Sequence, residues 1–419
     1  MKFTKIKSGA SVLASALAIS FASITMAAEV EVIHWWTSGG EQAAVSVFAD
    51  EFDKMGGDKW KDTAIAGGQN SRRVTMQRIL GGDPPGAAQF NPGRQYEELI
   101  EGDLLLDLTD LAKKEGWAKF IRPGSILTNA CIKNGKVWCV PVNIHSWQWG
   151  WVSTKVFKDS GIDKIPTNIQ DFLKAAPKIK AAGFIPFAIG GENWQHTGAF
   201  NVVLVAQLGK EGYYRLFRDK DEEYAKSAEV AKVLETWREL VSYSDAGSAG
   251  RNWNDTTNLV ITDKAGMQIM GDWAHGEFAV AKKVAGKDYE CLIGPSDTPY
   301  ITTDGDIFLF PKQSDPAVEA AQLKMASMMI SKKVQVAFNL AKGSLPVRGD
   351  VDMSAVDSCM RKGIKLLEDP KNIIISQGRL LNEDSTGQLN DLFAELSFNP
   401  NLSIKDAHER FVSIIENAE

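Results

Sequence analysis

The amino-terminal part of the chain holds a strand and then a helix, and the turn between them carries two large aromatic side chains. Residues 29–33 alternate polar and apolar side chains, which predicts a strand. Apolar residues then recur at helical spacing, which predicts a helix: Ala44, Val45, Phe48 and Phe52. The turn runs from Trp35 and Trp36 to Glu41. This pattern predicts an open α/β sheet, and such sheets bind ligands beyond the carboxyl ends of their strands.

The same arrangement of strand, glycine turn and tryptophan occurs twice more. A predicted strand at 184–189 ends in a turn with Trp194, and another at 265–270 ends in a turn with Trp273. Tryptophans that only filled the core would not be expected to gather at strand ends. Indole faces beside carboxylates suit a sugar, because its C–H groups pack on the ring while the carboxylate accepts hydrogen bonds from hydroxyls. The three turns therefore predict a tryptophan-lined sugar site.

Some of these tryptophans also have a purely structural interpretation. Successive side chains of a strand point to opposite faces, so one of Trp35 and Trp36 is expected to fill the core. Trp147, Trp149 and Trp151 alternate along a later segment and share one face, which favours buried sheet core. Of these three, Trp147 lies nearest the preceding turn and is the best placed to reach a ligand.

The first 27 residues have the features of a secretory signal peptide. Three lysines within residues 2–7 precede a mostly apolar stretch at 10–24, and the small residues Ala27 and Ala28 mark the cleavage point. No cysteine stands there, and no later stretch is long enough to cross a bilayer. The mature protein is therefore predicted to be exported to the periplasm.

Length and charge limit the architecture and the partners. A chain of 419 residues exceeds what one core usually serves, which predicts two domains. The net charge is −6, and loss of the three signal-peptide lysines makes the mature chain three charges more negative. This acidic balance argues against nucleic acid, an anionic membrane surface or a polyanionic ligand as the partner.

Four cysteines in an exported chain permit two disulfides. Cys131 and Cys139 flank a hairpin turn at Asn134 and Gly135. A three-residue loop would place these cysteines opposite each other, whereas a two-residue loop would place them on opposite faces; we predict the bridge. Cys291 and Cys359 then pair by exclusion, with buried free thiols as the alternative. Neither pair has the spacing of a metal site, and we predict neither a metal nor a cofactor.

The sequence contains no convincing catalytic constellation. The motifs of zinc peptidases, serine hydrolases, P-loop proteins and dinucleotide-binding folds are absent. Glu41, Glu192, Asp272 and Asp306 could in principle include a glycosidase pair, since two carboxylates suffice for that chemistry. A glycoside hydrolase-like enzyme is therefore the main alternative to a binding protein.

Six segments in a fixed order carry a family resemblance. They are 35–41, 82–85 with Gln89, 140–145, 271–273, 306–308 and 342–348. With them the chain resembles the extracellular solute-binding proteins of sugar ABC transporters, in particular the glucose-binding branch of the family 1 sugar-binding proteins. Each segment alone is a weak signal, but six in order, spread over most of the mature chain, are specific.

The resemblance implies a fold and a division of the chain. The implied fold is α/β, the two-lobed periplasmic-binding-protein fold of type II, in which each lobe is a mixed sheet flanked by helices and the ligand lies in the cleft between lobes. Residues 28–142 with 303–346 are expected to form the first lobe, and residues 143–302 with 347–419 the second. Hinge strands that cross more than once are expected to join them.

The resemblance also implies ligand contacts. The family's sugar site is lined by the positions that match Trp35, Trp36, Glu41, Trp273, Asp306 and Lys342. Asp306 would accept hydrogen bonds from adjacent hydroxyls while Lys342 donates to others, with a surface salt bridge as the structural alternative. The repeated turn pattern adds Trp194 from the other lobe.

Two departures from the glucose-binding branch bear on the identity of the ligand. That branch has a lysine just after the position of Gln89, where this chain has Phe90, and a histidine at the position of Gln377. A site loses much of its discrimination when a buried hydrogen-bond partner is altered, so a different hexose, a glucoside or a disaccharide is expected rather than free glucose. Asn91 and Gln377 remain candidate contacts.

Taken together, these features predict a monomeric periplasmic receptor. It would capture a mono- or small oligosaccharide by lobe closure and deliver it to the permease subunits of an ABC importer in the inner membrane. The alternatives are the glycoside hydrolase-like enzyme and a binding protein for a non-sugar solute such as a polyol.

Overall fold

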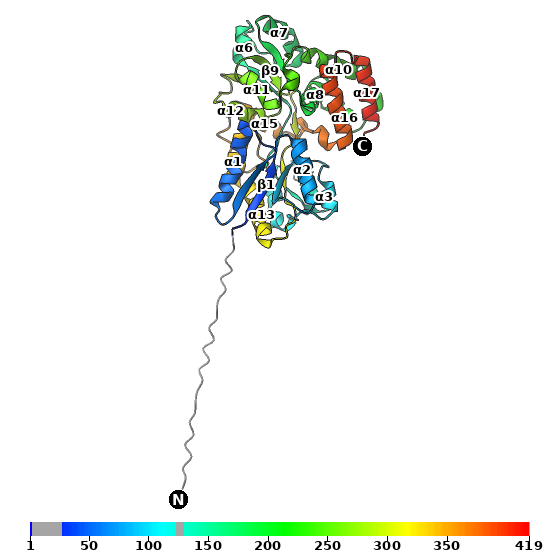
Figure 1. Cartoon of the computed structure of the whole chain (residues 1–419). Helices are drawn as coiled ribbons and strands as arrows, with labels where there is room; N and C mark the ends of the chain where they lie inside the picture. The colour runs from blue at the N-terminus through cyan, green and yellow to red at the C-terminus, as the bar shows by residue number, and fades with distance from the viewer. Residues whose placement is uncertain (2–26, 123–129, 419) are drawn as a thin grey trace.

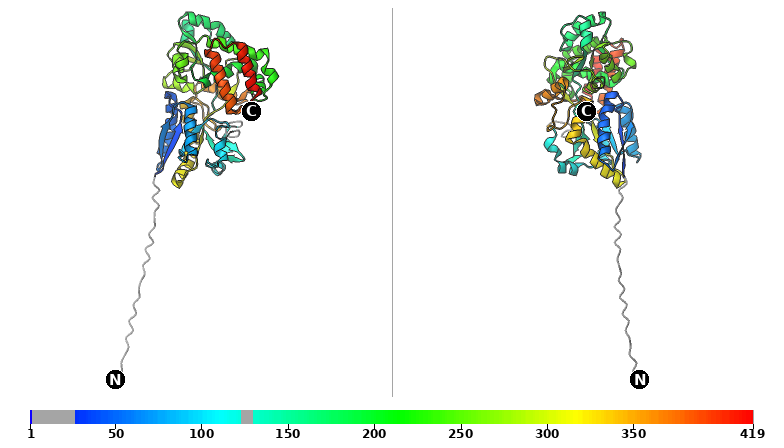
Figure 2. Two further views of the ribbon diagram at one scale, coloured as in Figure 1. Left: turned by 45° about the vertical axis from the view of Figure 1, so that its right-hand side comes forward. Right: turned by 90° about the vertical axis from the view of Figure 1, so that its left-hand side faces the viewer.

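The chain folds into two α/β lobes. The computed structural model describes residues 1, 27–122 and 130–418, so the predicted signal peptide falls almost entirely outside the described residues. One lobe contains the first strand and the other contains the carboxyl terminus (Figure 1). The two lobes stay distinct in both turned views (Figure 2). The predicted two-lobed α/β fold is confirmed.

The first lobe is built on a five-stranded sheet with the strand order β2-β1-β3-β12-β6. β1 runs parallel to β2 and β3, whereas β12 runs antiparallel to β3 and β6. The strands are β1 (Glu29–His34), β2 (Lys59–Ala64), β3 (Ala87–Phe90), β6 (Cys139–Pro141) and β12 (Ile307–Leu309). The helices are α1 (Gly39–Lys54), α2 (Gly68–Leu80), α3 (Glu97–Glu101), α4 (Thr109–Glu115), α5 (Trp117–Phe120), α13 (Pro316–Met329) and α14 (Lys332–Lys342).

The second lobe is built on a four-stranded sheet with the strand order β10-β7-β9-β8. β7 is antiparallel to β9 and β10, and β8 is parallel to β9. The strands are β7 (Trp149–Ser153), β8 (Ile185–Ala188), β9 (Ala265–Ile269) and β10 (Tyr289–Ile293). The helices are α6 (Thr154–Asp159), α7 (Ile169–Ala181), α8 (Asn193–Phe217), α9 (Glu222–Ala225), α10 (Ala228–Val241), α11 (Trp253–Ile261), α12 (Ala274–Val280), α16 (Glu383–Phe398) and α17 (Ile404–Glu416).

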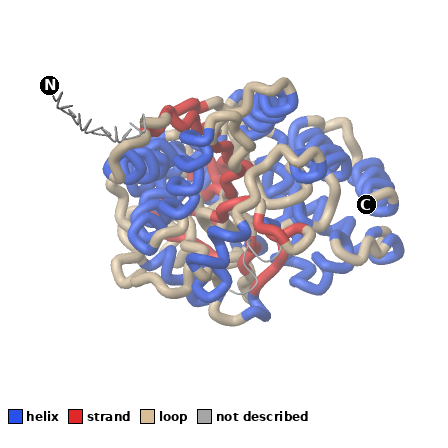
Figure 3. Tube along the Cα trace, turned by 90° about the horizontal axis from the view of Figure 1, so that it is seen from below, coloured by secondary structure: helices blue, strands red, loops and turns tan. Residues whose placement is uncertain are grey.

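Smaller elements complete the chain. β4 (Ile132–Lys133) and β5 (Lys136–Val137) form a hairpin, and β11 (Ile301–Thr303) pairs in parallel with β13 (Ile373–Ile375). Helix α15 (Ser358–Leu367) and three short 3₁₀ helices (Ser248–Gly250, Pro370–Asn372 and Gln377–Arg379) lie in the connecting segments. Seen from below, helices surround the strands (Figure 3). Within the described residues, no helix combines the length and the apolar character needed to cross a membrane.

Three segments pair with one another where the chain passes between the sheets. Ile144 bridges to Leu345, and His145 bridges to Asp304. The predicted division of the chain into lobes stays a prediction. Val347 and Val356 pack in the core of the first lobe, which favours a last crossing later than residue 346.

Trp36, Trp149 and Trp151 fill the hydrophobic cores, as predicted for one residue of the adjacent pair and for the alternating stripe. Trp36 is 1% exposed and packs against Phe308 and Phe338 in the first lobe, so one of the two adjacent tryptophans does fill the core. Trp149 and Trp151 are fully buried and stacked in the second lobe, which confirms that this stripe is sheet core. These buried rings stabilise the two sheets, and the sheets position the functional side chains.

Both predicted disulfides are present, with Cys131 bonded to Cys139 and Cys291 bonded to Cys359. The argument from loop length was wrong, however. Lys133 pairs with Lys136, so the hairpin has the two-residue turn that we expected to separate the cysteines. The bridge forms because the chain leaves the hairpin after Val137, and Cys139 belongs to β6 of the main sheet instead.

Candidate functional site

A buried ion pair joins the start of α1 to the end of α14. Lys342 Nζ lies 3.4 Å from Glu41 Oε1, and the side chains are 2% and 8% exposed. The ammonium also lies 5.8 Å from the centre of the Trp36 ring. The structural alternative to sugar binding was a surface salt bridge between Lys342 and Asp306, but the ion-pair partner of Lys342 is Glu41 and both side chains are buried. An ammonium has three donors, and in the described chain this one finds a single long contact, so donors remain for a ligand oxygen.

The sequence at the start of α1 explains how Glu41 is held. Ser38 is the N-cap residue and Glu41 stands three positions later, which is the capping-box arrangement. Glu41 Oε2 accepts hydrogen bonds from the backbone N–H groups of Thr37 and Ser38, at 3.2 and 3.3 Å. The cap thus uses one carboxylate oxygen and leaves the other facing Lys342.

Asp306 stands just before β12 and is held by three side-chain donors. Gln89 Nε2 donates to Oδ1, and Asn143 Nδ2 donates to Oδ2, each at 2.8 Å. His145 Nε2 lies 2.8 Å from Oδ2. Asp306 is 3% exposed. The predicted sugar acceptor is therefore largely occupied by protein donors, and its position is fixed by residues from β3 and the first crossing segment.

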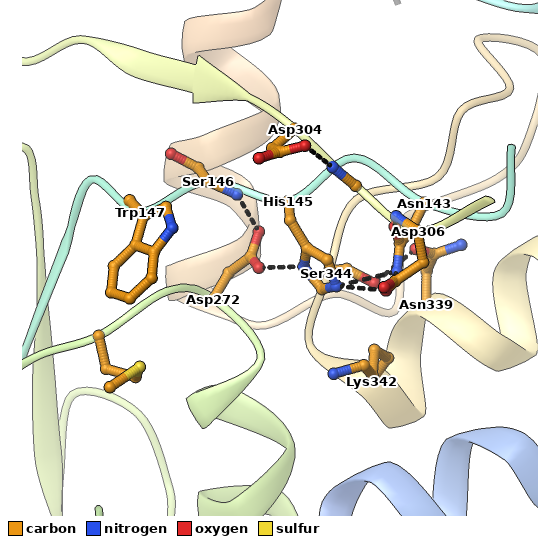
Figure 4. A network of polar contacts seen from close by, with 12 residues as sticks. Asn143, His145, Ser146, Trp147, Asp272, Asp304, Asp306, Asn339, Lys342 and Ser344 are labelled. Carbon is orange, nitrogen blue, oxygen red and sulfur yellow. Dashed lines mark hydrogen bonds and ion pairs between the residues drawn. The ribbon is translucent and has the colours of Figure 1, made fainter. Parts of the chain in front are cut away.

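His145 connects Asp306 to Asp272, which follows β9 in the second lobe. His145 Nδ1 lies 2.5 Å from Asp272 Oδ1, and the Ser146 N–H donates to Asp272 Oδ2 at 3.1 Å. Figure 4 shows the imidazole between the two carboxylates, with Lys342 beside it. A single histidine on a crossing segment therefore links the ends of two sheets that belong to different lobes.

This geometry shifts the pKa values of the linked groups. Burial opposes a charge on His145, but Asp272 and Asp306 outweigh it and raise its pKa to about 9. Burial also opposes a charge on Asp306, yet His145 and Lys342 hold its pKa below the usual range. Burial raises the pKa of Asp272 against the attraction of His145. At neutral pH the centre of the link is an imidazolium hydrogen-bonded to carboxylates.

Three tryptophans of the second lobe form one aromatic cluster. Trp147 contacts Trp194 and Trp273 edge to face, with ring centres 5.6 and 4.9 Å apart, and the Trp273 ring also lies edge-on to His145 at 5.2 Å. All three tryptophans are only partly buried. The cluster therefore brings predicted Trp194 and Trp273 together and places them beside the His145 link.

Two glycines, Gly271 of a strand-end turn and Gly198 inside α8, make room for tryptophan rings. A Cβ on Gly271 would lie 2.1 Å from the Trp273 ring, and one on Gly198 would lie 2.3 Å from the Trp147 ring. No side chain fits at either position. The strand-end glycine lets the following tryptophan fold back over the backbone.

The two adjacent tryptophans of the first turn have different surroundings. Trp36 lies in the core below Lys342, whereas Trp35 is partly exposed. The guanidinium of Arg72 lies 5.5 Å from the Trp35 ring and donates to Asn91 Oδ1 at 3.1 Å. Asn91 in turn donates to the carbonyl of Gly305, next to Asp306. Trp35 and Asn91 therefore lie on the same side of the first lobe as the buried charges.

Gln377 lies on the second-lobe side, against α8. Asn201 Nδ2 donates to Gln377 Oε1 at 2.6 Å, and both residues are buried. Gln377 Nε2 and Asn201 Oδ1 have no partner among the described residues. Trp194, Gly198 and Asn201 follow one another at helical spacing, so they share one face of α8. The acceptor of Asn201 on this helix face, and the donor of Gln377 beside it, are thus available to a ligand.

The lobes touch each other beside the ion pair. The Gly40 N–H at the start of α1 donates to Glu277 Oε1 of α12 at 2.8 Å. A Cβ on Gly40 would lie 2.6 Å from the Gly276 backbone. Two glycines therefore allow α1 and α12 to approach closely at the edge of the candidate site.

Our sequence prediction gave no role to five residues of this site: Arg72, Gln89, Asn143, His145 and Asn201. It named Trp147 as the best placed of three tryptophans to reach a ligand, and Asp272 only as a possible glycosidase carboxylate. Some of them left a signal in the sequence. Asn143 and His145 are polar residues inside an otherwise apolar segment, and Asn201 interrupts the apolar run of α8. Buried polar residues need partners, so such interruptions mark candidate sites.

Comparisons with known proteins agree with this architecture. The family model described as "Bacterial extracellular solute-binding protein" matches residues 36–336. A "Probable sugar-binding periplasmic protein" of Mesorhizobium japonicum is 38% identical over 358 residues, which cover 84% of each chain. An "Uncharacterized ABC transporter extracellular-binding protein" of Pyrococcus horikoshii is 30% identical over 399 residues, covering 92% of this chain and 86% of that protein.

Solved structures show the same fold. A "Chitin oligosaccharide binding protein" superposes with a TM-score of 0.77 at 16% identity, covering 94% of this chain and 99% of that one. The bacterial solute receptor AcbH superposes with a TM-score of 0.75 at 18% identity, covering 93% and 97%. The family match extends over both lobes, and the chain therefore belongs to the bacterial extracellular solute-binding proteins.

Proposed function

We propose that this protein is the periplasmic receptor of a sugar ABC importer and binds its ligand between the two lobes. The observation that carries the proposal is a buried polar cluster, with donors and acceptors left over, beside partly exposed tryptophan rings. Lys342 has spare donors, and Gln377 and Asn201 each have one atom without a partner. Hydroxyl groups can donate and accept, while the C–H face of a sugar ring packs on indole.

Lobe closure is the proposed mechanism of capture. The first lobe supplies charged groups and the second supplies aromatic rings and amides, so a ligand contacts all of them only when the lobes are together. Such a ligand shifts the population toward the closed form. The contact of Gly40 with Glu277 and the His145 link are the direct connections that would respond to this movement.

The names of relatives support a sugar as the ligand class. Relatives are named as sugar-binding periplasmic proteins, and the more distant relative XacG of Haloferax volcanii is named as a xylose/arabinose-binding protein. We extend this to a mono- or small oligosaccharide, a cleaved signal peptide, a monomeric mature protein and delivery to a permease in the inner membrane.

The proposal contains no catalytic step. A glycosidase needs one carboxylic acid that is protonated near neutral pH. Asp306 has a lowered pKa. Burial raises the pKa of Asp272, but both of its oxygens are engaged by His145 and Ser146. These two carboxylates are therefore suited to holding the imidazolium rather than to transferring protons.

Tryptophan fluorescence of the mature protein, titrated with monosaccharides, disaccharides and polyols, tests the proposal. We expect a saturable spectral change with at least one sugar, and the sugar should be recovered unchanged afterwards. Hydrolysis of the ligand would instead support the enzyme alternative, and a response to polyols alone would assign a non-sugar solute. No response to any compound would contradict the tryptophan-lined site.

A further inference from the structure

Arg72 lies across the face of Trp35 in the first lobe. Its guanidinium carbon is 5.5 Å from the ring centre. A Cβ on Gly68, one helical turn earlier, would lie 3.1 Å from Arg72 Nη1 and 3.5 Å from the Trp35 ring. The glycine therefore leaves room for the guanidinium and the indole to pack together.

The guanidinium has few acceptors. It carries five N–H donors, and within the described residues its hydrogen bond is the 3.1 Å contact from Nη1 to Asn91 Oδ1. No carboxylate of the described chain forms an ion pair with it, and burial lowers its pKa against the distant attraction of Glu383. Its neighbour Arg73 is exposed and bonds to both Asn70 and Gln77. The side chain is only partly buried, so the remaining donors are available to a ligand oxygen.

Arg72 stands at the same end of the sheet as Asp306. Asn91, its acceptor, bonds to the carbonyl of Gly305 at 3.2 Å. Trp35 N–H donates to Gln89 Oε1, and the other end of that amide donates to Asp306. Arg72 is thus linked through Asn91 to Gly305, next to Asp306, and Trp35 is linked through Gln89 to Asp306 itself.

Position 90 cannot provide a donor here. Phe90 is fully buried and packs edge-on against Tyr96. The cation on this side of the site comes from α2, as Arg72.

We infer that Arg72 is a ligand-binding and specificity-determining residue that donates two hydrogen bonds to adjacent oxygen atoms of the sugar stacked near Trp35. A planar guanidinium matches two neighbouring oxygens better than an ammonium does. Neighbouring hydroxyls of a neutral sugar and the carboxylate of a sugar acid both offer such a pair. The nearby carboxylates of Glu41 and Asp306 favour the neutral sugar. The inference rests on the proposed function and adds a residue and a chemical preference to it.

The test compares Arg72→Gln and Arg72→Lys with Arg73→Gln, which changes the adjacent exposed arginine of the same helix. The probes are D-glucose, D-galactose, maltose and D-glucuronate, followed by monodeoxy derivatives of the neutral sugar that binds most tightly. Calorimetry measures affinity, and thermal unfolding without sugar measures stability. We expect Arg72→Gln to weaken neutral-sugar binding at least tenfold, Arg72→Lys to weaken it less, and Arg73→Gln to have no effect.

Two further readouts separate binding from a structural role. At least one deoxy sugar should bind the wild type more weakly than the parent sugar, and Arg72→Gln should remove that difference. The melting temperature of Arg72→Gln without sugar should be nearly unchanged, because Arg72 is partly exposed and forms no ion pair within the described residues.

Several outcomes would overturn the inference. Unchanged sugar affinity in Arg72→Gln would do so while leaving the proposed function intact, as would a lower melting temperature with an unaltered pattern among deoxy sugars. Binding of D-glucuronate alone would replace the neutral sugar by a sugar acid as the partner of Arg72. A wild type that binds none of the probes would contradict the proposed function and this inference together.

Discussion

The two lobes contribute different chemistry to the candidate site. The first lobe provides buried charges that are mostly paired, such as Glu41 with Lys342 and Asp306 with its three donors. The second lobe provides partly exposed indole rings and the amides of Asn201 and Gln377, of which two atoms have no partner. The first lobe therefore contributes a preformed polar network to the site. The second lobe contributes rings and amide atoms that would find their partners in a ligand.

This difference suggests a division of energetic roles. Paired buried charges contribute to the stability of the folded chain, because removing one partner leaves another unsatisfied. Exposed aromatic faces and unpaired amides contribute little to the free protein and more to the complex. Substitutions of the paired buried charges in the first lobe should therefore affect unfolding, and substitutions of the partly exposed tryptophans in the second should affect mainly affinity.

The largest expected effect follows from removal of Asp306. Asp306→Ala leaves His145, Asn143 and Gln89 without their shared acceptor. The free energy of unfolding, measured with urea at pH 7, should fall by about 3–5 kcal/mol. Asp163→Ala removes an exposed carboxylate and should change it by less than about 0.5 kcal/mol. Equal losses in the two variants would contradict the stabilising role of the network.

The pH dependence of stability tests the same network. His145 has a folded pKa of about 9 against an ordinary value of 6.5, so between these values the folded protein holds a proton that the unfolded chain has lost. Its contribution should be complete below pH 6.5 and lost as the pH rises through 9, with a slope of at most about 1.4 kcal/mol per pH unit. His145→Gln should flatten the curve in this range, and an unaltered slope would place the titration elsewhere.

Trp273→Ala tests the second lobe. Removal of this partly exposed ring should weaken sugar binding at least tenfold, about 1.4 kcal/mol, while the free protein loses less stability than Asp306→Ala does. Trp60→Ala changes a tryptophan of strand β2 and should leave affinity unchanged. If Trp273→Ala unfolded as easily as Asp306→Ala, the distinction between the two lobes would fail.

Glu41 has one oxygen in the helix cap and one facing Lys342, and two substitutions can separate these roles. Glu41→Ala should weaken sugar binding at least tenfold, and it should also cost at least about 1 kcal/mol of stability through the lost cap, with a further loss because buried Lys342 keeps no charge partner. Glu41→Gln keeps a capping side chain but removes the charge that faces Lys342, so it should cost less stability than Glu41→Ala while affinity still falls. Unchanged affinity in both Glu41→Ala and Trp273→Ala would reject the site assignment.

The local elements of the site could be predicted from the sequence. Alternation around Val32 and the helical spacing after Glu41 predicted β1 and α1, and the glycine before Trp273 predicted its strand-end turn. These patterns are local, because side chains two, three or four residues apart decide them. The partner of Lys342 could not be predicted in this way. Glu41 and Lys342 are 301 residues apart, and Asp306 was an equally reasonable choice until the helices were placed.

The sequence by itself determined the turns that carry the tryptophans, because they depend on residue type and short spacing. The class of the fold followed from six segments in a fixed order, and the second disulfide followed from the count of four cysteines. Only the tertiary structure decided that Trp36 is core, that Asp306 is held by His145, Asn143 and Gln89, and that Arg72 lies over Trp35. The physical reason is that these arrangements depend on how separate sheets and helices pack. Burial and hydrogen-bond pairing then select one partner among several that the sequence allows.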